Sequence, residues 1–184
     1  MKHTSLTAIL GCVWLGLSAG TAPGQTKPTT PNDRIGVYDS RVVAYAHFWT
    51  EDHMRKIKEM SNAAKKAKAS GQTERFKELS ANLKKEQDQN HLRVFSTAPV
   101  DDVLNEMKDR VAAIQKEAGV SRLASKWDEK ALKTYKPDQQ IDVTDRLLRE
   151  FKLNEKQLKI VADMRKQKPL PLEKAQELMR KGEL

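Results

Sequence analysis

Cysteine and aromatic residues are scarce in this sequence. Its 184 residues include a single cysteine, and phenylalanine, tyrosine and tryptophan together make up 5%. One cysteine excludes an internal disulfide framework, and so few aromatic residues argue against a large packed core. The length allows one domain with appendages. We therefore expect one small domain whose stability does not depend on disulfides.

Motifs for several kinds of chemistry are also missing. The chain has no glycine-rich loop to cradle a phosphate, and no alternation of aromatic and basic residues typical of a nucleic-acid platform. His91 has no partner in the sequence for a nucleophilic triad. Trp127 beside Lys126 could stack on a base or a sugar, but a tryptophan that ends a strand is more often a core anchor. We expect no catalytic residues, no cofactor and no nucleic-acid partner.

Two groups of polar residues come nearest to a chemical site. His47 and His53, with the two acidic residues between them, could hold a metal ion. Histidines six residues apart share a helix face less well than an i, i+4 pair does, so we interpret them as surface or helix-start residues and expect no metal. Asp39, Asp142 and Asp145 could meet at one end of a sheet as paired carboxylates. Capping and turn formation explain Asp39 and Asp145 equally well, and we favour that structural interpretation.

The longest apolar run is short and lies at the N-terminus. Residues 6–17 follow the positive Lys2 and precede small residues, which is typical of a secretory signal peptide over residues 1–20. The run is too short to span a bilayer comfortably. A lipoprotein signal with an acylated Cys12 is the less favoured alternative, because the apolar run continues past this cysteine. We expect export to the periplasm, with residues 21–33 forming a flexible leader.

Charge is plentiful and unevenly spread. The formal net charge is +9, and charged residues make up 32% of the chain. Residues 51–93 contain eleven lysines and arginines against seven aspartates and glutamates, and residues 146–184 contain eleven against six. A basic face can attract an anionic lipid surface or acidic protein segments. Interleaved lysine and glutamate also form an ordinary solvated helix surface, which we regard as the commoner case.

Residues 100–118 carry the clearest helical pattern of the chain. Apolar side chains recur there every three or four residues, and most charged ones fall on the opposite side. We expect one helix, capped by Ser96 or Thr97 and ended by Gly119 in a left-handed conformation. The apolar positions are Val100, Val103, Leu104, Met107, Val111, Ile114 and Ala118.

A helical hairpin is predicted over residues 50–93. Thr50 is placed to cap a first helix that runs to residue 69, Ser70 and Gly71 break the pattern, and a second helix begins at Thr73. Each helix is about 30 Å long at 1.5 Å per residue. The hairpin has few large apolar residues, so other helices from this chain or from other copies must complete its seam.

Short β-prone segments surround the hairpin. Residues 35–39, 120–127 and 141–143 are predicted strands, and residues 128–140 a loop. Helices are expected after Thr144 and after Asn154, with a short tail helix at residues 172–180 in a C-terminal segment 169–184. The second of these helices should turn Leu158, Val161 and Met164 inward. The fold class is therefore α+β and mostly helical: a small β-sheet head, a helical hairpin arm and C-terminal helices, with residues 34–168 as one domain.

The order of these segments resembles the Skp/OmpH family of periplasmic chaperones. Three stretches carry the resemblance: residues 35–40 (Ile-Gly-Val-Tyr-Asp-Ser), residues 113–126 as helix, glycine and strand, and residues 141–145 (Ile-Asp-Val-Thr-Asp) before the last helices. The resemblance covers residues 34–151. It implies a homotrimer in which strands of each subunit build a small barrel and basic helical arms enclose an unfolded outer-membrane protein, without an energy source or a cofactor.

The same resemblance places client contacts on the arm. It assigns apolar contacts to Met54, Ile57, Met60, Phe76 and Leu79. It assigns long-range electrostatic attraction to lysines such as Lys65, Lys66, Lys84 and Lys85. The chain departs from the family in its short arm and its long tail. The alternative is a monomeric envelope-associated module that docks on anionic lipid or on another envelope protein through its basic face.

Overall fold

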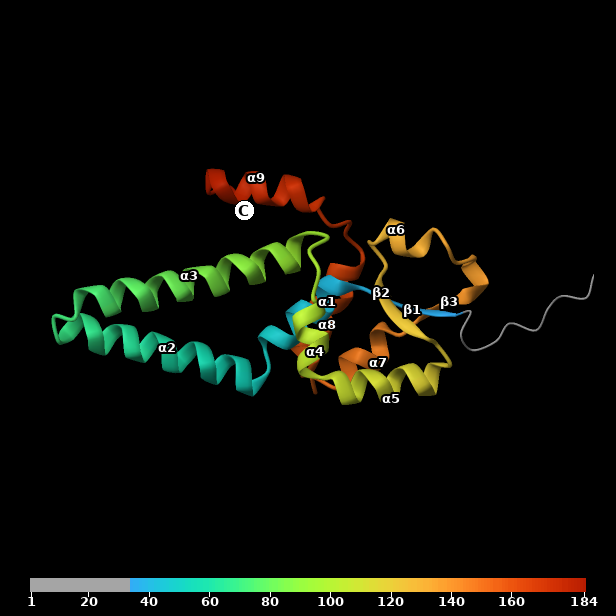
Figure 1. Cartoon of the computed structure of the whole chain (residues 1–184), viewed down its shortest axis with the longest axis horizontal. Helices are drawn as coiled ribbons and strands as arrows, with labels where there is room; N and C mark the ends of the chain where they lie inside the picture. Colours follow the sequence, from blue (N-terminus) through green and yellow to red (C-terminus); the bar gives the residue numbers. More distant parts are fainter. Residues whose placement is uncertain (1–33) are drawn as a thin grey trace, which may run out of the picture.

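A computed structural model describes residues 34–184. A head built around a small sheet carries a long helical arm on one side, and the last helix lies beside that arm (Figure 1). The described part is mostly helical with one three-stranded sheet, so the predicted α+β class is confirmed. The proposed signal peptide, the leader and Cys12 lie outside the described residues. No helix in residues 34–184 is both long and apolar enough to cross a bilayer.

The sheet is entirely parallel, with the first strand in its centre. The strands are β1 (Ile35–Tyr38), β2 (Arg122–Ser125) and β3 (Gln140–Asp142), in the order β2-β1-β3. Val37 lies opposite Ala124 on one side and Asp142 on the other. The carboxyl ends of all three strands therefore meet at one edge of the sheet.

All three strands differ from their predicted bounds, and the first ends at Tyr38, one residue earlier than predicted. The second is shorter than residues 120–127, and the third ends one residue earlier than predicted. Val143 still donates its backbone N–H to Val37 O over 2.9 Å, but its side chain is completely buried in the core as the chain turns into a helix. The predicted loop between the strands contains a short helix α6 (Glu129–Leu132) and a 3-10 turn η2 (Pro137–Gln139).

One helix, α1 (Ser40–Phe48), separates the first strand from the arm. Asp39 caps α1, and Thr50 caps α2 (Glu51–Ala69) by accepting the His53 N–H over 3.3 Å. The arm returns as α3 (Thr73–Phe95), after a turn in which Gly71 has a φ of +69°. The predicted hairpin, its cap and its break are confirmed, because all three depend on local sequence.

The predicted helix over residues 100–118 is two helices. α4 (Asp101–Glu106) and α5 (Lys108–Ala118) are separated at Met107, which has φ −114° and ψ 29°. Neither glycine nor proline marks this bend. Val103 and Ile114, about 16 Å apart along a straight helix, are both buried in one core cluster, and the bend lets both reach it. Gly119 ends α5 with a φ of +63°, as expected.

The predicted cap of this segment is also wrong. No side chain caps α4. Ser96 accepts the N–H of Ala98 over 3.2 Å and stabilises the turn before α4. Thr97 accepts the N–H of Leu172 over 3.2 Å and holds the start of the last helix.

The remaining helices pack around the head and the arm. They are α7 (Thr144–Arg149), α8 (Glu155–Arg165) and α9 (Leu172–Lys181). Thr144 does not cap α7; its Oγ1 accepts the N–H of Asp39 over 3.1 Å instead. Asn154 caps α8 together with Gln157, as predicted for this position. Val161 is buried, but Leu158 is 48% exposed, so the expected inward row on α8 is only partly correct.

The last helix lies along α3, next to the arm (Figure 1). A short parallel bridge between Ser96 and Leu170 fixes its start, and Ala175 is completely buried. A partner for the arm thus comes from the same chain.

The core lies between the sheet and the helices on either side of it. One cluster joins β1 and α1 to the helices α4, α5 and α7, and a second, smaller cluster joins α1 to α7 and α8. The largest completely buried apolar side chains include Ile35, Val42, Val43 and Leu147. The arm beyond the head contributes only small buried apolar residues, Ala64 and Ala67.

Candidate functional site

A largely apolar groove of about 510 Å³ lies at the root of the arm. One wall comes from the end of α1 and the start of α2, and the other comes from the C-terminal half of α3. The groove is within the size range of pockets that bury small ligands or side-chain clusters. Its lining residues are Tyr45, Phe48, Trp49, Ile57, Leu83, Gln87, Asn90, His91, Val94 and Phe95.

Aromatic side chains dominate the head end of this groove. Trp49 makes edge-to-face contacts with Tyr45 and Phe48, at ring-centroid distances of 6.4 and 5.2 Å. Trp49 is nevertheless 43% exposed and Phe95 is 50% exposed. Aromatic residues make up only 5% of the chain, yet these two are not used in the core. Exposed large aromatic residues at the edge of an apolar concavity are typical of a surface that binds a partner.

Asn90 is one of the polar residues that line the groove, together with Gln87 and His91. Its side chain is 7% exposed, and its amide nitrogen has no hydrogen-bond partner among the described residues. Buried polar groups in folded proteins almost always have a partner, so this donor is unusual.

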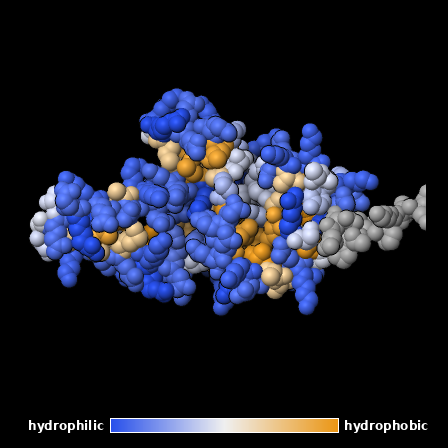
Figure 2. Space-filling view, viewed as in Figure 1, coloured by the Kyte–Doolittle hydropathy of each residue, from blue (hydrophilic) through white to orange (hydrophobic). Residues whose placement is uncertain are grey.

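The predicted client-contact residues occupy different parts of the arm. Of the five apolar ones, only Ile57 lines the groove. Met54 is exposed, whereas Met60, Phe76 and Leu79 are half-buried along the arm. The hydrophobic positions of the arm therefore serve partly to hold its two helices together, and apolar atoms show along the arm as small areas between hydrophilic ones (Figure 2).

The four predicted lysines are all exposed. Lys84 pairs with Asp88 over 2.7 Å on its own helix. Lys65, Lys66 and Lys85 make no ion pair with any residue in 34–184. Exposed, unpaired lysines leave a positive potential around the arm.

Sequence reasoning missed most of the groove. Tyr45, Phe48 and Trp49 form a short aromatic run just before the predicted hairpin, and that run was the available signal. Their partners Val94 and Phe95 lie almost fifty residues later. Only the return of the hairpin brings the two segments together.

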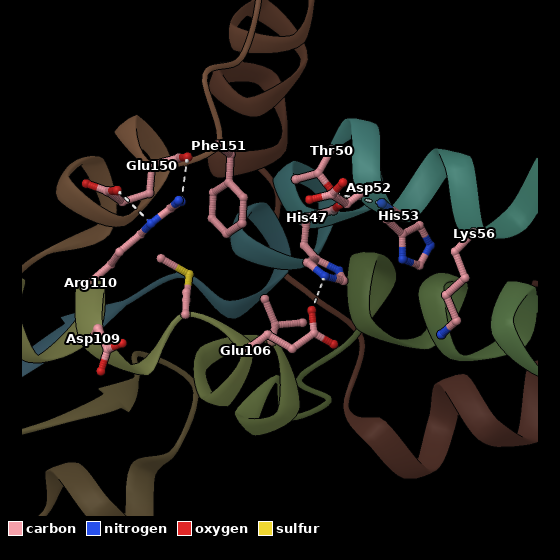
Figure 3. Close-up of a pocket in the computed structure, with 12 residues that line it drawn as sticks. His47, Thr50, Asp52, His53, Lys56, Glu106, Asp109, Arg110, Glu150 and Phe151 are labelled. Atoms are coloured by element: carbon pink, nitrogen blue, oxygen red, sulfur yellow. Dashed lines mark hydrogen bonds and ion pairs between the residues drawn. The ribbon is translucent and has the colours of Figure 1, made fainter.

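A second, polar pocket of about 400 Å³ lies where the arm joins α4 and α5 (Figure 3). His47 Nε2 lies 2.9 Å from Glu106 Oε2, and Phe151 points between this pair and the pair formed by Arg110 and Glu150. Two pairs of opposite charge are thus matched inside this pocket, whereas Asp109, which also lines it, forms no ion pair with a described residue. Within residues 34–184 no three His, Cys, Asp or Glu side chains are grouped so that they could hold a metal ion.

His53 is packed against His47 at the edge of this pocket. Their ring centroids are 5.0 Å apart, and His53 Nε2 is buried without a hydrogen-bond partner among the described residues. Burial, followed by the charge of His47, lowers the pKa of His53 below its ordinary value. The protonated form is therefore disfavoured in the folded protein.

Lowering the pH from 7.5 to 5.5 should destabilise the protein through His53. In the unfolded chain the histidine takes up a proton near its ordinary pKa of about 6.5. As the pH is lowered, the unfolded state therefore binds this proton before the folded state does, and the free energy of unfolding decreases. His53→Phe should make the melting temperature less dependent on pH over this range, measured by circular dichroism. His91→Phe removes a half-exposed histidine and is the control; if it flattens the pH profile equally, His53 is not the group responsible.

A buried charge network lies at the carboxyl edge of the sheet. Asp39 is 1% exposed and accepts hydrogen bonds from Arg41 Nη2 at 3.1 Å, Lys126 Nζ at 2.7 Å and Trp127 Nε1 at 3.2 Å. Arg41 is also buried and reaches Met164 O on α8 over 3.1 Å. Burial opposes ionisation of Asp39, but Arg41 and Lys126 outweigh it and hold the pKa of this carboxyl below its ordinary value.

The three aspartates considered as paired carboxylates are used separately. Asp39 serves the network above and caps α1. Asp142 accepts the N–H of Thr144 over 2.8 Å, and Asp145 pairs with Arg165 on α8. Asp39 caps a helix as expected, whereas Asp145 forms an ion pair and does not cap α7.

Comparison of the chain with protein-family models gives no match, nor does comparison with curated proteins or with solved structures. The resemblance to the Skp/OmpH family therefore stays a prediction from the sequence.

Proposed function

We propose that the protein is an exported, non-enzymatic binding protein that holds unfolded envelope proteins, with outer-membrane proteins as the expected clients. The observation that carries this proposal is the apolar groove at the root of a basic arm, with Trp49 and Phe95 exposed at its edge. Unfolded chains expose apolar side chains that such a groove can remove from water.

The two halves of the site have complementary physical roles. Removing apolar area from water contributes a favourable transfer free energy of roughly 25 cal/mol per Å², which the ordering of the bound chain partly offsets and which does not depend on a defined client sequence. Unpaired lysines on the arm attract acidic chains from a distance and raise the association rate. Neither role needs an energy source.

The test is binding of a fluorescently labelled, urea-unfolded outer-membrane β-barrel protein, diluted into the purified protein and followed by anisotropy. Trp49→Ser with Phe95→Ser should weaken binding at least about tenfold, because exposed aromatic anchors carry much of the affinity of such surfaces. Both side chains are substantially exposed, so the fold should tolerate their loss.

Leu158→Ser with Ile160→Ser is the matched control. These α8 side chains are 48% and 38% exposed and lie outside the groove. An equal loss of binding in the control would show a non-specific apolar effect and contradict the proposal. Binding only to anionic vesicles, abolished by salt, would favour the lipid-docking module instead.

We also propose that three chains assemble through their sheets. The three-stranded sheet leaves β2 and β3 as edge strands within the described residues, and edge strands are templates for pairing with another chain. Light scattering on a sizing column at physiological salt should give the mass of three chains. A monomer mass over a wide concentration range would exclude this assembly while leaving the groove intact.

A further inference from the structure

We propose that the head of the protein contains a separate binding site for a small aliphatic amine in its ammonium form. The site is a pocket of about 380 Å³ along β2 and at the carboxyl end of β1, and it shares no lining residue with the groove. Three observations carry the inference: the position of the pocket on the sheet, the hydroxyl group of Tyr38, and two carboxylates without an ion-pair partner among the described residues.

The pocket lies where an open parallel sheet offers room for a ligand. Its walls come from β2, from Tyr38 at the end of β1, from residues 97–101 that lead into α4, and from residues 127–131 around the start of α6. Figure 1 shows α6 next to the end of β2. Ligands of open α/β sheets bind near the carboxyl ends of the strands, and the volume is within the range of small-molecule sites.

Tyr38 presents its hydroxyl group to this pocket. The residue is only 4% exposed, and its hydroxyl makes no hydrogen bond with any residue in 34–184. The hydroxyl oxygen is not among the fully covered atoms of the described residues, so solvent reaches it. Asp101 and Asp128, which both line the pocket, act electrostatically on this same hydroxyl. A buried hydroxyl almost always has a partner, and a ligand in the pocket would supply one.

The hydroxyl of Tyr38 stays neutral beside these carboxylates. Burial, followed by the negative charges of Asp101 and Asp128, raises the pKa of Tyr38 above its ordinary value. A neutral phenol has one donor and two acceptor lone pairs. It can therefore accept an N–H of an ammonium group, whose positive charge the two carboxylates stabilise.

Asp101 and Asp128 make the pocket attractive to cations. Both side chains are exposed, and neither forms an ion pair with a residue in 34–184. The nearest cationic side chains are held elsewhere: Arg122 lies 5.4 Å from the ring centroid of Tyr135, and Lys126 belongs to the buried network at the edge of the sheet. Two carboxylates next to a hydroxyl acceptor favour a ligand that is positive and donates several hydrogen bonds, as a primary ammonium does.

Other cations fit the pocket less well. Within residues 34–184 no three His, Cys, Asp or Glu side chains are grouped to hold a metal ion. A quaternary ammonium binds best over a free aromatic face, but Arg41 and Lys126 already lie 5.0 and 4.6 Å from the ring centroid of Trp127. Leu123 and Ala131 in the lining leave apolar contacts for a short alkyl chain.

The probe is butylammonium, titrated into the isotope-labelled purified protein at constant ionic strength and followed by nuclear magnetic resonance. Assigned backbone amide signals of residues 122–128 should move, whereas those of residues 45–49 in the groove should not. Butanol lacks the charge and butyltrimethylammonium lacks the N–H donors, so each should bind at least about tenfold more weakly. Equal binding of either compound, or no movement of the residue 122–128 signals, would overturn the inference.

A lysine blocked at both backbone ends distinguishes the source of the ammonium group. It carries the same butylammonium chain attached to a peptide-like backbone. We expect it to bind no more tightly than butylammonium, because the pocket is of the size of a small-molecule site. Clearly tighter binding would overturn the free amine as ligand in favour of a protein lysine.

The role of Tyr38 is tested by Tyr38→Phe, which removes only the hydroxyl oxygen. Loss of a hydrogen bond to a charged group should weaken butylammonium at least about tenfold. The melting temperature should not fall, because the hydroxyl has no partner in residues 34–184 to leave behind. Unchanged affinity would overturn the inference.

The carboxylates are tested by Asp101→Asn with Asp128→Asn. Asparagine retains the capping of α6 by residue 128, and loss of the two charges should weaken butylammonium about threefold to tenfold. Glu129→Gln with Asp138→Asn is the matched control, since it removes two exposed charges of the head that do not line the pocket. An equal loss in the control would mean that net charge sets binding, and the inference would fail. These exposed variants keep the test decisive if Tyr38→Phe does not fold.

The inference stands apart from the proposed function. If unfolded clients bind through Trp49 and Phe95 while butylammonium does not bind, only the amine site is wrong. If butylammonium binds as expected while unfolded clients do not, only the holding function is wrong.

Discussion

Asp39→Asn should lower the free energy of unfolding by about 3–5 kcal/mol, the range for breaking a buried ion pair. The substitution leaves Arg41 buried without its anionic partner, and it removes the negative charge that Lys126 approaches. It also weakens the link from the sheet to α8 through Arg41. Urea unfolding followed by circular dichroism measures the change.

The control for this prediction is Asp145→Asn. Asp145 also pairs with an arginine, Arg165, but its side chain is 77% exposed. An exposed pair contributes about 0–1 kcal/mol, so this variant should be close to the parent in stability. Similar decreases in the free energy of unfolding of the two variants would mean that the buried network stabilises the fold no more than an exposed ion pair does.

The same network predicts the behaviour of the protein in acid. The pKa of Asp39 is lower in the folded protein than in the unfolded chain. Ionised Asp39 therefore stabilises the folded state above the unfolded pKa, and this stabilisation is lost as the pH falls through the folded pKa. This loss occurs below about pH 4, well separated from the His53 effect at pH 5.5–7.5. Asp39→Asn should reduce the loss of stability in acid and leave the pH dependence caused by His53 unchanged.

Leu147→Ala should lower the free energy of unfolding by about 2–5 kcal/mol, the usual range for a truncation that leaves a cavity in a core. Leu147 is completely buried on α7, in the cluster that also contains Val103 and Ile114. Its removal loosens the contact of α7 with the sheet and with α5. Urea unfolding again provides the measurement.

Leu158→Ala is the matched control, since the same atoms are removed from a side chain that is 48% exposed on α8. Surface substitutions of this kind usually change stability by no more than about 0.5 kcal/mol. A large effect at Leu158, or a small one at Leu147, would contradict the assignment of the core to the face of α7 that holds Leu147.

The sequence alone determined the parts of this protein that depend on neighbouring residues. The hairpin, the Thr50 cap, the turn at Gly71 and the end of α5 at Gly119 were predicted and are present. Caps, glycine turns and amphipathic periodicity act within one or two turns of chain, so a single sequence contains the necessary information. The α+β class followed from the same local signals.

Contacts between distant segments were decided by the tertiary structure. Thr144 was expected to cap its own helix but accepts the N–H of Asp39, and Thr97 accepts the N–H of Leu172. The helix expected over residues 100–118 bends at Met107 without a local signal, because two distant apolar positions reach one cluster. A side chain takes the partner that folding brings within reach, and spacing along the chain does not specify that partner.

The candidate site is one of the features that depend on contacts between distant segments. Ile57 was predicted from the arm sequence, whereas Trp49, Asn90 and Phe95 acquire their role only when α3 returns beside α1. Composition and spacing predicted a basic helical arm and its local ends. Apolar burial is non-directional, so only the packed structure determined which of the few aromatic residues stayed exposed and where they formed a groove.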